Sequence, residues 1–310
     1  MIRRREFLLP ATTLGALLLA GNPAQRAVAI TIDDLPRGGD WPKPSTVAEL
    51  LKLNRDFLAP FLRGKIPLTG FVNAGRTGLT PPQLDQLLRL WLHAGAELGN
   101  HTHTHPDLNN TPLETYVANI VECHLSLSRV TKPRYFRHPF LHAGPDEAKR
   151  QGLERFLAGQ GYRVAPVTLD NSDYMFAALY GHAVAKHDQA AASQIRAAYL
   201  PYLDSIFAFF EQRSVEVFGR EIPQVLLLHV SLLNAHAMPD ILAMIARRGY
   251  RIDPLEAVLS DPAFQSRDAY YGRGGFSWIH RWSRTMGLPN RGEPDEPAFI
   301  RAGFERLQSR

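Results

Sequence analysis

Two histidines four residues apart, His101 and His105, follow a short apolar run and could bind one metal ion together. Residues i and i+4 lie on one side of a helical turn, which would bring both imidazoles to the same ion. The adjacent carboxylates of Asp33 and Asp34 end another apolar run, and they repel each other unless a cation or separate hydrogen bonds stabilise them. The alternative is that one carboxylate simply caps the following loop. Two imidazoles and one carboxylate, with open positions, suit catalytic zinc and other divalent ions.

Three further polar side chains, Arg137, Asp173 and His229, come at or just after other apolar runs. A guanidinium such as that of Arg137 can hold a carboxylate through two parallel hydrogen bonds. A lone histidine at a strand end is more often structural than functional. With the carboxylate pair and the histidine pair, however, the chain has five polar strand ends, and this number favours one shared site.

The segments around these residues alternate between strand and helix patterns. Short β-branched runs are typical of buried parallel strands, and Thr46 with Glu49 forms a capping box that opens a helix. The strand patterns cover residues 27–32, 66–73, 134–137, 162–169 and 225–229. The helix patterns cover residues 46–62, 111–130, 145–159 and 240–248, and a further helix starts at Pro81. Seven or so such units over about 230 residues favour a parallel (β/α) barrel, whose chemistry lies at the strand ends.

The composition is that of a packed globular protein, with 45% hydrophobic and 21% charged residues among 310. It excludes an intrinsically disordered chain and a protein with several membrane spans. The single cysteine, Cys123, excludes a disulfide framework and a thiolate metal cluster. The net charge is only +5 and the basic residues are spread along the chain, so we expect no nucleic-acid partner.

The first 24 residues have the pattern of an export signal. Three arginines at positions 3–5 precede a moderately apolar run that ends near Ala20 and is too short to span a bilayer. The segment Arg4-Arg5-x-Phe7-Leu8 resembles a twin-arginine signal, which exports folded proteins. A short amphipathic surface helix is the alternative. We expect removal of this segment, leaving an exported, periplasmic or secreted protein without a stable membrane span.

Five short motifs occur in order along the chain: Thr31-Ile32-Asp33-Asp34, His101-Thr102-x-x-His105, Arg137-x-Pro139-Phe140, Asp170-x-x-Asp173-Tyr174 and Leu227-x-His229. This order resembles that of the polysaccharide deacetylases, carbohydrate esterase family four, which share the NodB-homology domain. The resemblance covers residues 27–255. It implies an α/β fold, a distorted (β/α) barrel of the polysaccharide deacetylase type, that binds one divalent metal ion, most often Zn²⁺.

The resemblance also implies a role for each motif residue. The three implied metal ligands are Asp34, His101 and His105. Asp33 would be the catalytic base, held by Arg137, and His229 would be the catalytic acid, oriented by Asp173. Val230 follows His229 where many members have Asp, so Asp173 is the expected partner of that histidine.

Two parts of the chain depart from the family pattern. After Asp173, residues 183–218 carry apolar side chains at helical spacing, and we expect a helical insertion that packs against the barrel, with a substrate lid as the alternative. The end of the chain is rich in aromatic residues, and its role does not follow from the sequence. The expected division is an export signal (1–24), a deacetylase barrel (25–255) and an aromatic-rich C-terminal extension (256–310).

The residue chemistry and the resemblance agree on hydrolysis of an acetamide. A metal would polarise the carbonyl, Asp33 would take a proton from water, and His229 would protonate the departing amine. We therefore expect a metal-dependent polysaccharide N-deacetylase, a hydrolase of non-peptide C–N bonds. Its partner would be an N-acetylated saccharide, namely a chitin oligomer, peptidoglycan or an exopolysaccharide. The alternatives are a hydrolase of small amides or imides on the same scaffold and an inactive carbohydrate-binding protein.

Overall fold

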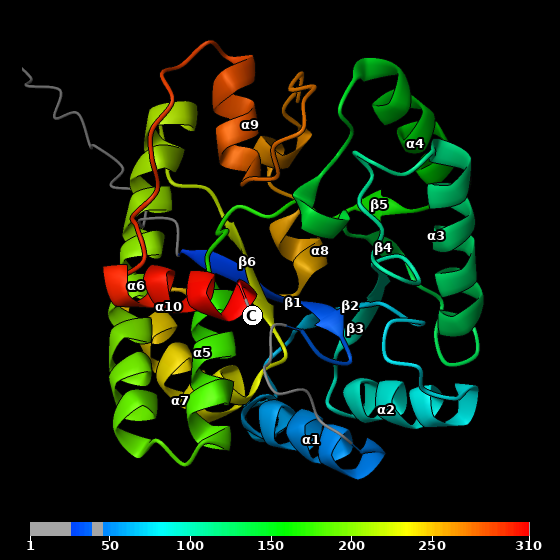
Figure 1. Ribbon diagram of the computed structural model, residues 1–310. Helices are drawn as coiled ribbons and strands as arrows, with labels where there is room; N and C mark the ends of the chain where they lie inside the picture. The colour runs from blue at the N-terminus through cyan, green and yellow to red at the C-terminus, as the bar shows by residue number, and fades with distance from the viewer. Residues whose placement is uncertain (1–25, 39–45, 310) are drawn as a thin grey trace, which may run out of the picture.

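The computed structural model describes residues 26–38 and 46–309, so the expected export signal lies outside the described residues. Its core is a sheet of seven parallel strands (Figure 1). These are β1 (Ala27–Leu35), β2 (Thr69–Val72), β3 (Glu97–Asn100), β4 (Tyr135–Phe136), β5 (Arg163–Val164), β6 (Gln224–His229) and β7 (Arg251–Ile252). The strand order is β5-β4-β3-β2-β1-β6, and β7 pairs with the start of β1.

The segment after β5 closes the sheet. β5 pairs with β4 at one edge, whereas Leu169, five residues later, forms a parallel bridge with Leu226 of β6 at the other edge. The Leu169 N–H donates to Val225 O at 3.0 Å, and the Leu227 N–H donates to Leu169 O at 3.2 Å. The chain thus runs from one edge to the other, and the sheet curls into the distorted barrel that the sequence predicts. The single strand predicted over residues 162–169 is wrong, because Pro166 has no N–H donor and the chain changes partner there.

Helices surround the barrel in the way that parallel strands require (Figure 1). In chain order they are α1 (Val47–Gly64), α2 (Pro81–His93), α3 (Leu113–Leu127), α4 (Glu147–Gly159), α5 (Asp173–Ala185), α6 (Gln189–Phe218), α7 (Leu232–Arg247), α8 (Leu255–Val258), α9 (Trp278–Thr285) and α10 (Ala298–Gln308). The capping box of Thr46 and Glu49 is confirmed at the start of α1. The helix predicted at 240–248 begins earlier, because the Ser231 hydroxyl accepts the Asn234 N–H at 3.0 Å and caps the first turn.

The predicted helical insertion is present as the end of α5 and the 30-residue helix α6. One face of α6 is buried in the main core, including Ile195 and Ile206. The rings of Tyr199 and Tyr202 lie 5.2 and 5.1 Å from that of Phe176 in α5. The insertion therefore packs against the barrel, as expected, and contacts between aromatic rings hold the two helices together.

The C-terminal extension is also part of the core and not a loose tail. Trp278 and Trp282 of α9 are buried, and the Trp278 N–H donates to Val167 O at 2.8 Å. The Ser277 hydroxyl donates to Thr168 O at 2.7 Å, beside the segment that closes the barrel. In the part of the chain that the structure describes, no helix is both long and apolar enough to cross a membrane.

Candidate active site

The polar residues predicted to act together lie at the carboxyl ends of neighbouring strands. Asp33 and Asp34 are at the end of β1, and Asp33 is in register with His229 at the end of β6. His101 follows β3 directly, and Arg137 follows β4. Because all the strands are parallel, these ends meet at one edge of the barrel, where loops of different origin can build a common site.

Asp34, His101 and His105 form a compact cluster whose potential ligand atoms lie within 4.8 Å of one another. Asp34 Oδ1 is 3.6 Å from His101 Nε2 and 3.3 Å from His105 Nε2. This oxygen is buried and has no hydrogen-bond partner among the described residues, an arrangement that is costly without a ligand. The donor set of two imidazoles and one carboxylate fits a divalent metal such as zinc.

The electrostatics of the cluster favour the protonation states that a metal requires. Burial lowers the pKa of His101 to about 4 and that of His105 to about 3, so both imidazoles are neutral at pH 7. Burial alone would raise the pKa of Asp34, but the attraction of His105 and His101 lowers it to about 2. His101 Nδ1 lies 2.8 Å from Arg137 O and donates to it, which leaves Nε2 as the free ligand atom.

The helical turn predicted for residues 101–105 is wrong. The segment is a loop in which Thr102 and His105 adopt left-handed backbone conformations, with φ of 69° and 60°. Such conformations are costly for residues with a side chain, so side-chain hydrogen bonds have to hold them. Asn100 Oδ1 accepts the Thr102 N–H at 2.8 Å, and the Thr102 hydroxyl accepts the His105 N–H at 3.1 Å. The loop places the two rings 4.9 Å apart without a helix.

Arg137 holds Asp33 as predicted, and the pair is fully enclosed. One guanidinium nitrogen, Nη1, donates to both carboxylate oxygens of Asp33 at 2.9 and 3.0 Å. The other nitrogens donate to Thr31 Oγ1 and to Ala165 O, so Arg137 is fixed in the barrel. Burial raises the pKa of Asp33 in spite of Arg137, whereas that of Asp34 is lowered. Two adjacent carboxylates whose pKa values shift in opposite directions are suited to different tasks. Asp33, the more basic of the two, is suited to accepting a proton.

His229 is oriented by Asp173, also as predicted. Its Nδ1 lies 2.8 Å from Asp173 Oδ1, and its backbone N–H donates to Asp173 Oδ2 at 2.8 Å. Asn234 donates to the same Oδ2 at 2.8 Å, which fixes the carboxylate. Burial lowers the pKa of His229, but the charge of Asp173 and its hydrogen bond outweigh burial and raise that pKa to about 9. The imidazolium at the strand end is therefore a proton donor at neutral pH.

The other histidines near the site are engaged elsewhere. His138 is buried with its ring stacked on Trp278, at 6.2 Å between centroids, and burial holds its pKa well below the usual range. His142 Nδ1 lies 2.7 Å from an oxygen of Asp107. His103 Nε2 lies 4.0 Å from Glu122 of α3, away from the cluster. His229 is thus the protonated imidazole that faces the cluster.

A cavity of about 620 Å³ opens over the site and is lined by Asp34, His105 and His229. Its size is typical of small-molecule sites. Phe140 also lines it, with φ of 56° and its ring 4.4 Å from that of His105. Tyr174 forms another part of the wall.

Part of the cavity wall comes from the C-terminal extension, which no motif in the sequence assigns to the site. The additional lining residues from that part are Gly275, Glu293, Phe304 and Gln308. Gly275 packs so closely that a Cβ there would lie 1.8 Å from Phe140 O, so a side chain at this position would displace one of the two segments. The pattern Gly274-Gly275 is the only local sign of this close approach in the sequence, and it does not name the partner.

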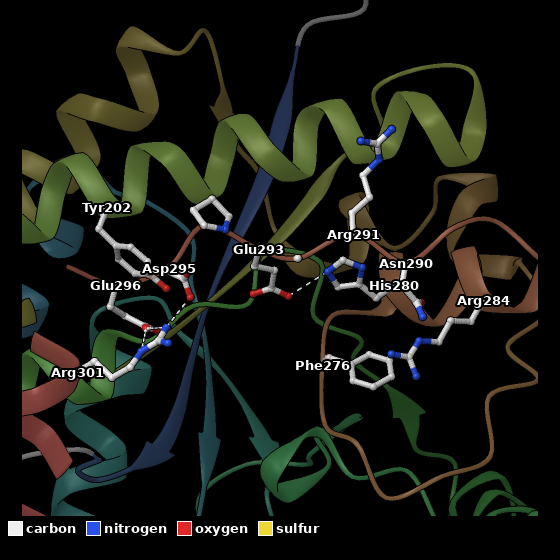
Figure 2. Close-up of a pocket in the computed structure, with 12 residues that line it drawn as sticks. Tyr202, Phe276, His280, Arg284, Asn290, Arg291, Glu293, Asp295, Glu296 and Arg301 are labelled. Atoms are coloured by element: carbon white, nitrogen blue, oxygen red, sulfur yellow. Dashed lines mark hydrogen bonds and ion pairs between the residues drawn. The ribbon is translucent and has the colours of Figure 1, made fainter. Parts of the chain in front are cut away.

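Glu293 connects this cavity with a second cavity of about 390 Å³, shown in Figure 2. Its carboxylate points to His280, with 3.0 Å between Oε1 and Nε2, and Arg301 pairs with Asp295 nearby (Figure 2). Burial and the charge of Glu293 together raise the pKa of Asp170 to about 7. The C-terminal extension therefore shapes both the wall and the electrostatics of the site.

Residues 20–154 match the family model described as polysaccharide deacetylase. No curated protein matches the chain by sequence. Among solved structures, the chain is similar to the chitin deacetylase of the fungal pathogen Colletotrichum lindemuthianum, at 20% identity and a TM-score of 0.49, over 78% of this chain and 92% of that one. It is similar to a family 4 carbohydrate esterase from Streptomyces lividans, at 18% identity and a TM-score of 0.47, over 75% and 95% of the two chains. A family 4 pseudoenzyme from Bacillus anthracis is similar at 14% identity and a TM-score of 0.47, over 77% and 66%.

The matched residues contain the whole Asp34, His101 and His105 cluster, together with Asp33 and Arg137. The parallel barrel and the position of this cluster at its strand ends agree with that match. Residues 20–154 of the chain are thus similar to the polysaccharide deacetylase family, and the candidate metal cluster lies within them.

Proposed function

We propose that the protein is a metal-dependent hydrolase that removes N-acetyl groups from N-acetylated saccharides. The observation that carries this proposal is the position of the Asp34, His101 and His105 cluster between a base and an acid. Asp33 Oδ2 lies 3.9 Å from His101 Nε2, and Asp33 is the register partner of His229. A metal site, a buried carboxylate with a raised pKa beside it and an imidazolium that lines the cavity form the set that amide hydrolysis needs.

Each residue has a defined task in this proposal. A divalent metal, which we propose to be zinc, would supply Lewis acidity toward the acetamide carbonyl and lower the pKa of water. Asp33 accepts the proton of the attacking water, and Arg137 keeps its carboxylate aligned. The Phe140 N–H, at the cavity wall, stabilises the negative charge on the carbonyl oxygen. His229 donates its proton to the departing nitrogen, since an amine anion is a poor leaving group.

Acetate release from a substrate panel tests the proposal. The purified, zinc-loaded protein is incubated with N-acetylglucosamine oligomers, peptidoglycan fragments, an acetylated exopolysaccharide and a set of small amides and imides. We expect acetate from at least one saccharide and none from the small amides. Turnover of small amides or imides alone would show that the protein is a hydrolase of small molecules. Binding of saccharides without any turnover would identify an inactive carbohydrate-binding protein.

Metal binding is expected at a stoichiometry of about one ion per chain, because the three ligands form one cluster. The His101→Ala and His105→Ala variants should each lose most of this metal. Elemental analysis after dialysis measures the effect, with His236→Ala as a control, since His236 bonds to Tyr180 at 2.8 Å away from the cluster. Wild-type stoichiometry in both ligand variants would show that the metal binds elsewhere.

The His229 imidazole is expected to titrate near pH 9 in the metal-free protein, because Asp173 stabilises its charged form. A raised pKa means that the proton is held through neutral pH and lost only above about 9. In Asp173→Asn, burial remains but the largest stabilising charge and its hydrogen bond are lost, so the pKa of His229 should fall. NMR titration of the ring signals measures both, with Asp107→Asn as the control that leaves His229 unchanged. An unaltered His229 titration in Asp173→Asn would contradict the assigned pairing.

We also propose that the protein is exported and acts in the periplasm or outside the cell. The support is the arginine-rich start and the short apolar run of residues 1–24. N-terminal sequencing of the mature protein should give a start near residues 21–25. Full-length protein with Met1 in the cytoplasm, and none in the exported fraction, would refute this localisation.

A further inference from the structure

The two carboxylate oxygens of Asp34 lie in different surroundings. Oδ1 faces His105 Nε2 at 3.3 Å and His101 Nε2 at 3.6 Å, and it has no hydrogen-bond partner among the described residues. Oδ2 lies 2.5 Å from Nη1 of Arg76, a residue outside the motifs that carry the family resemblance. One oxygen is thus turned toward the cluster, and the other is already taken by a cation.

A tight loop holds Arg76 in this position. Asn73, the first residue after β2, donates its N–H to Leu35 O at 2.9 Å and its side-chain amide to His101 O at 2.5 Å. The Gly75 N–H donates to His103 O at 2.8 Å. A Cβ on Gly75 would lie 2.2 Å from the His103 ring, so the loop closes on the histidine segment only with glycine there. The loop is therefore tied both to the end of β1 and to the segment that carries the two histidines.

We propose that Arg76 is a positioning residue that restricts Asp34 to a single ligand oxygen. A carboxylate can bind a cation through one oxygen or through both. A guanidinium on Oδ2 leaves only Oδ1 to the metal, so Asp34 and the two histidines supply three ligand atoms and an open position remains for the reaction. The inference rests on the metal site of the proposed function, but it concerns the number of ligand atoms and not the substrate.

The cation also has an electrostatic effect with a definite sign. A positive charge beside Asp34 repels a divalent ion and draws electron density away from the carboxylate, so Arg76 weakens metal binding. Its removal frees the second oxygen at the same time, and both effects tighten the binding of the metal. An arginine that only stabilised the loop would have the opposite signature, since its loss would loosen the ligands and weaken binding.

The test uses Co²⁺, whose visible absorption reports the number of ligands without any turnover. The full protein is loaded with Co²⁺ as wild type, Arg76→Ala and Arg76→Lys. The matched control is Arg129→Ala, because Arg129 also forms a surface ion pair, at 2.9 Å to Asp85, with a similar exposed fraction of 36% against 41% for Arg76. Circular dichroism confirms the fold of each variant, and competition with a chelator gives the affinity.

In Arg76→Ala we expect a weaker, shifted visible band from a higher coordination number. The affinity for Co²⁺ should rise by about tenfold, which is similar in size but opposite in direction to the usual effect of removing a residue that supports a metal ligand. Arg76→Lys should keep most of the wild-type spectrum, because an ammonium can still hold one oxygen. An unchanged band, or loss of Co²⁺ from a folded Arg76→Ala variant, would overturn the role of Arg76 alone. Absence of Co²⁺ binding by the wild type would overturn the metal site itself and, with it, this inference.

Discussion

Replacement of Asp33 by asparagine is expected to reduce deacetylation by at least about 10²–10⁴-fold, the usual contribution of a general base, while the metal content stays at the wild-type level. Asparagine has nearly the same shape and still accepts a hydrogen bond from Arg137, but it cannot take a proton from water. The raised pKa of Asp33 and its two bonds to Arg137 make it the proton acceptor of the pair. Turnover of a saccharide substrate and elemental analysis of the same sample measure the two effects together.

The control is Asp34→Asn, which should lose metal and activity in parallel, because Asp34 Oδ1 faces both histidines. Circular dichroism is needed for Asp33→Asn, since the fully buried Arg137 loses its charge partner there. If Asp33→Asn loses its metal as well as its activity, the roles of the two carboxylates are exchanged. If it keeps wild-type turnover, Asp33 is not the base.

Replacement of His229 by alanine is expected to lower kcat on an acetamide by about 10²–10⁴-fold, the usual range for loss of a general acid. Departure of an unprotonated amine is prohibitive, so a donor has to face the departing nitrogen. His229 lines the cavity, holds its proton at neutral pH, and is fixed by Asp173. His103, His138 and His142 are engaged with other groups and do not offer a substitute.

The leaving group separates a proton donor from a residue that only positions the substrate. The phenolate of an aryl acetate is a good leaving group that needs little protonation, so His229→Ala should lose far less activity on an aryl acetate than on an acetamide. His236→Ala is the control, because this histidine bonds to Tyr180 outside the site. Equal losses on the two substrates would show that His229 places the substrate or the metal and does not act as the acid.

The short apolar runs and their polar ends could be predicted from the sequence, and so could the fold class. A β-branched run that ends in two carboxylates is a local pattern, and parallel strands bring all such ends to one edge of a barrel. The grouping of Asp34 with His101 and His105, the bond from Arg137 to Asp33 and the pairing of Asp173 with His229 follow the predicted arrangement. Strand order brings Asp33, Arg137 and His229 together, whereas the position of His105 depends also on its loop.

The conformations of the loops could not be predicted from the sequence in the same way. The spacing of His101 and His105 suggested a helical turn, but Asn100 and Thr102 side chains stabilise left-handed backbone instead. Helical periodicity and a hydrogen-bonded loop can give the same distance between two rings, and only the second needs partners that the spacing does not reveal. The change of strand partner at Pro166 was missed for a related reason, since apolar character continues through a bend.

The sequence by itself determined the barrel class, the residue types at the strand ends and the resemblance to a family, because these depend on local periodicity and on motifs read along the chain. Only the tertiary structure decided that Arg76 takes one oxygen of Asp34, and that Glu293 and Gly275 of the C-terminal extension complete the cavity. Those contacts join residues distant in sequence, in one case by more than 130 positions between Gly275 and Phe140. Their energy comes from close packing and charge pairing across the closed barrel, which no local pattern encodes.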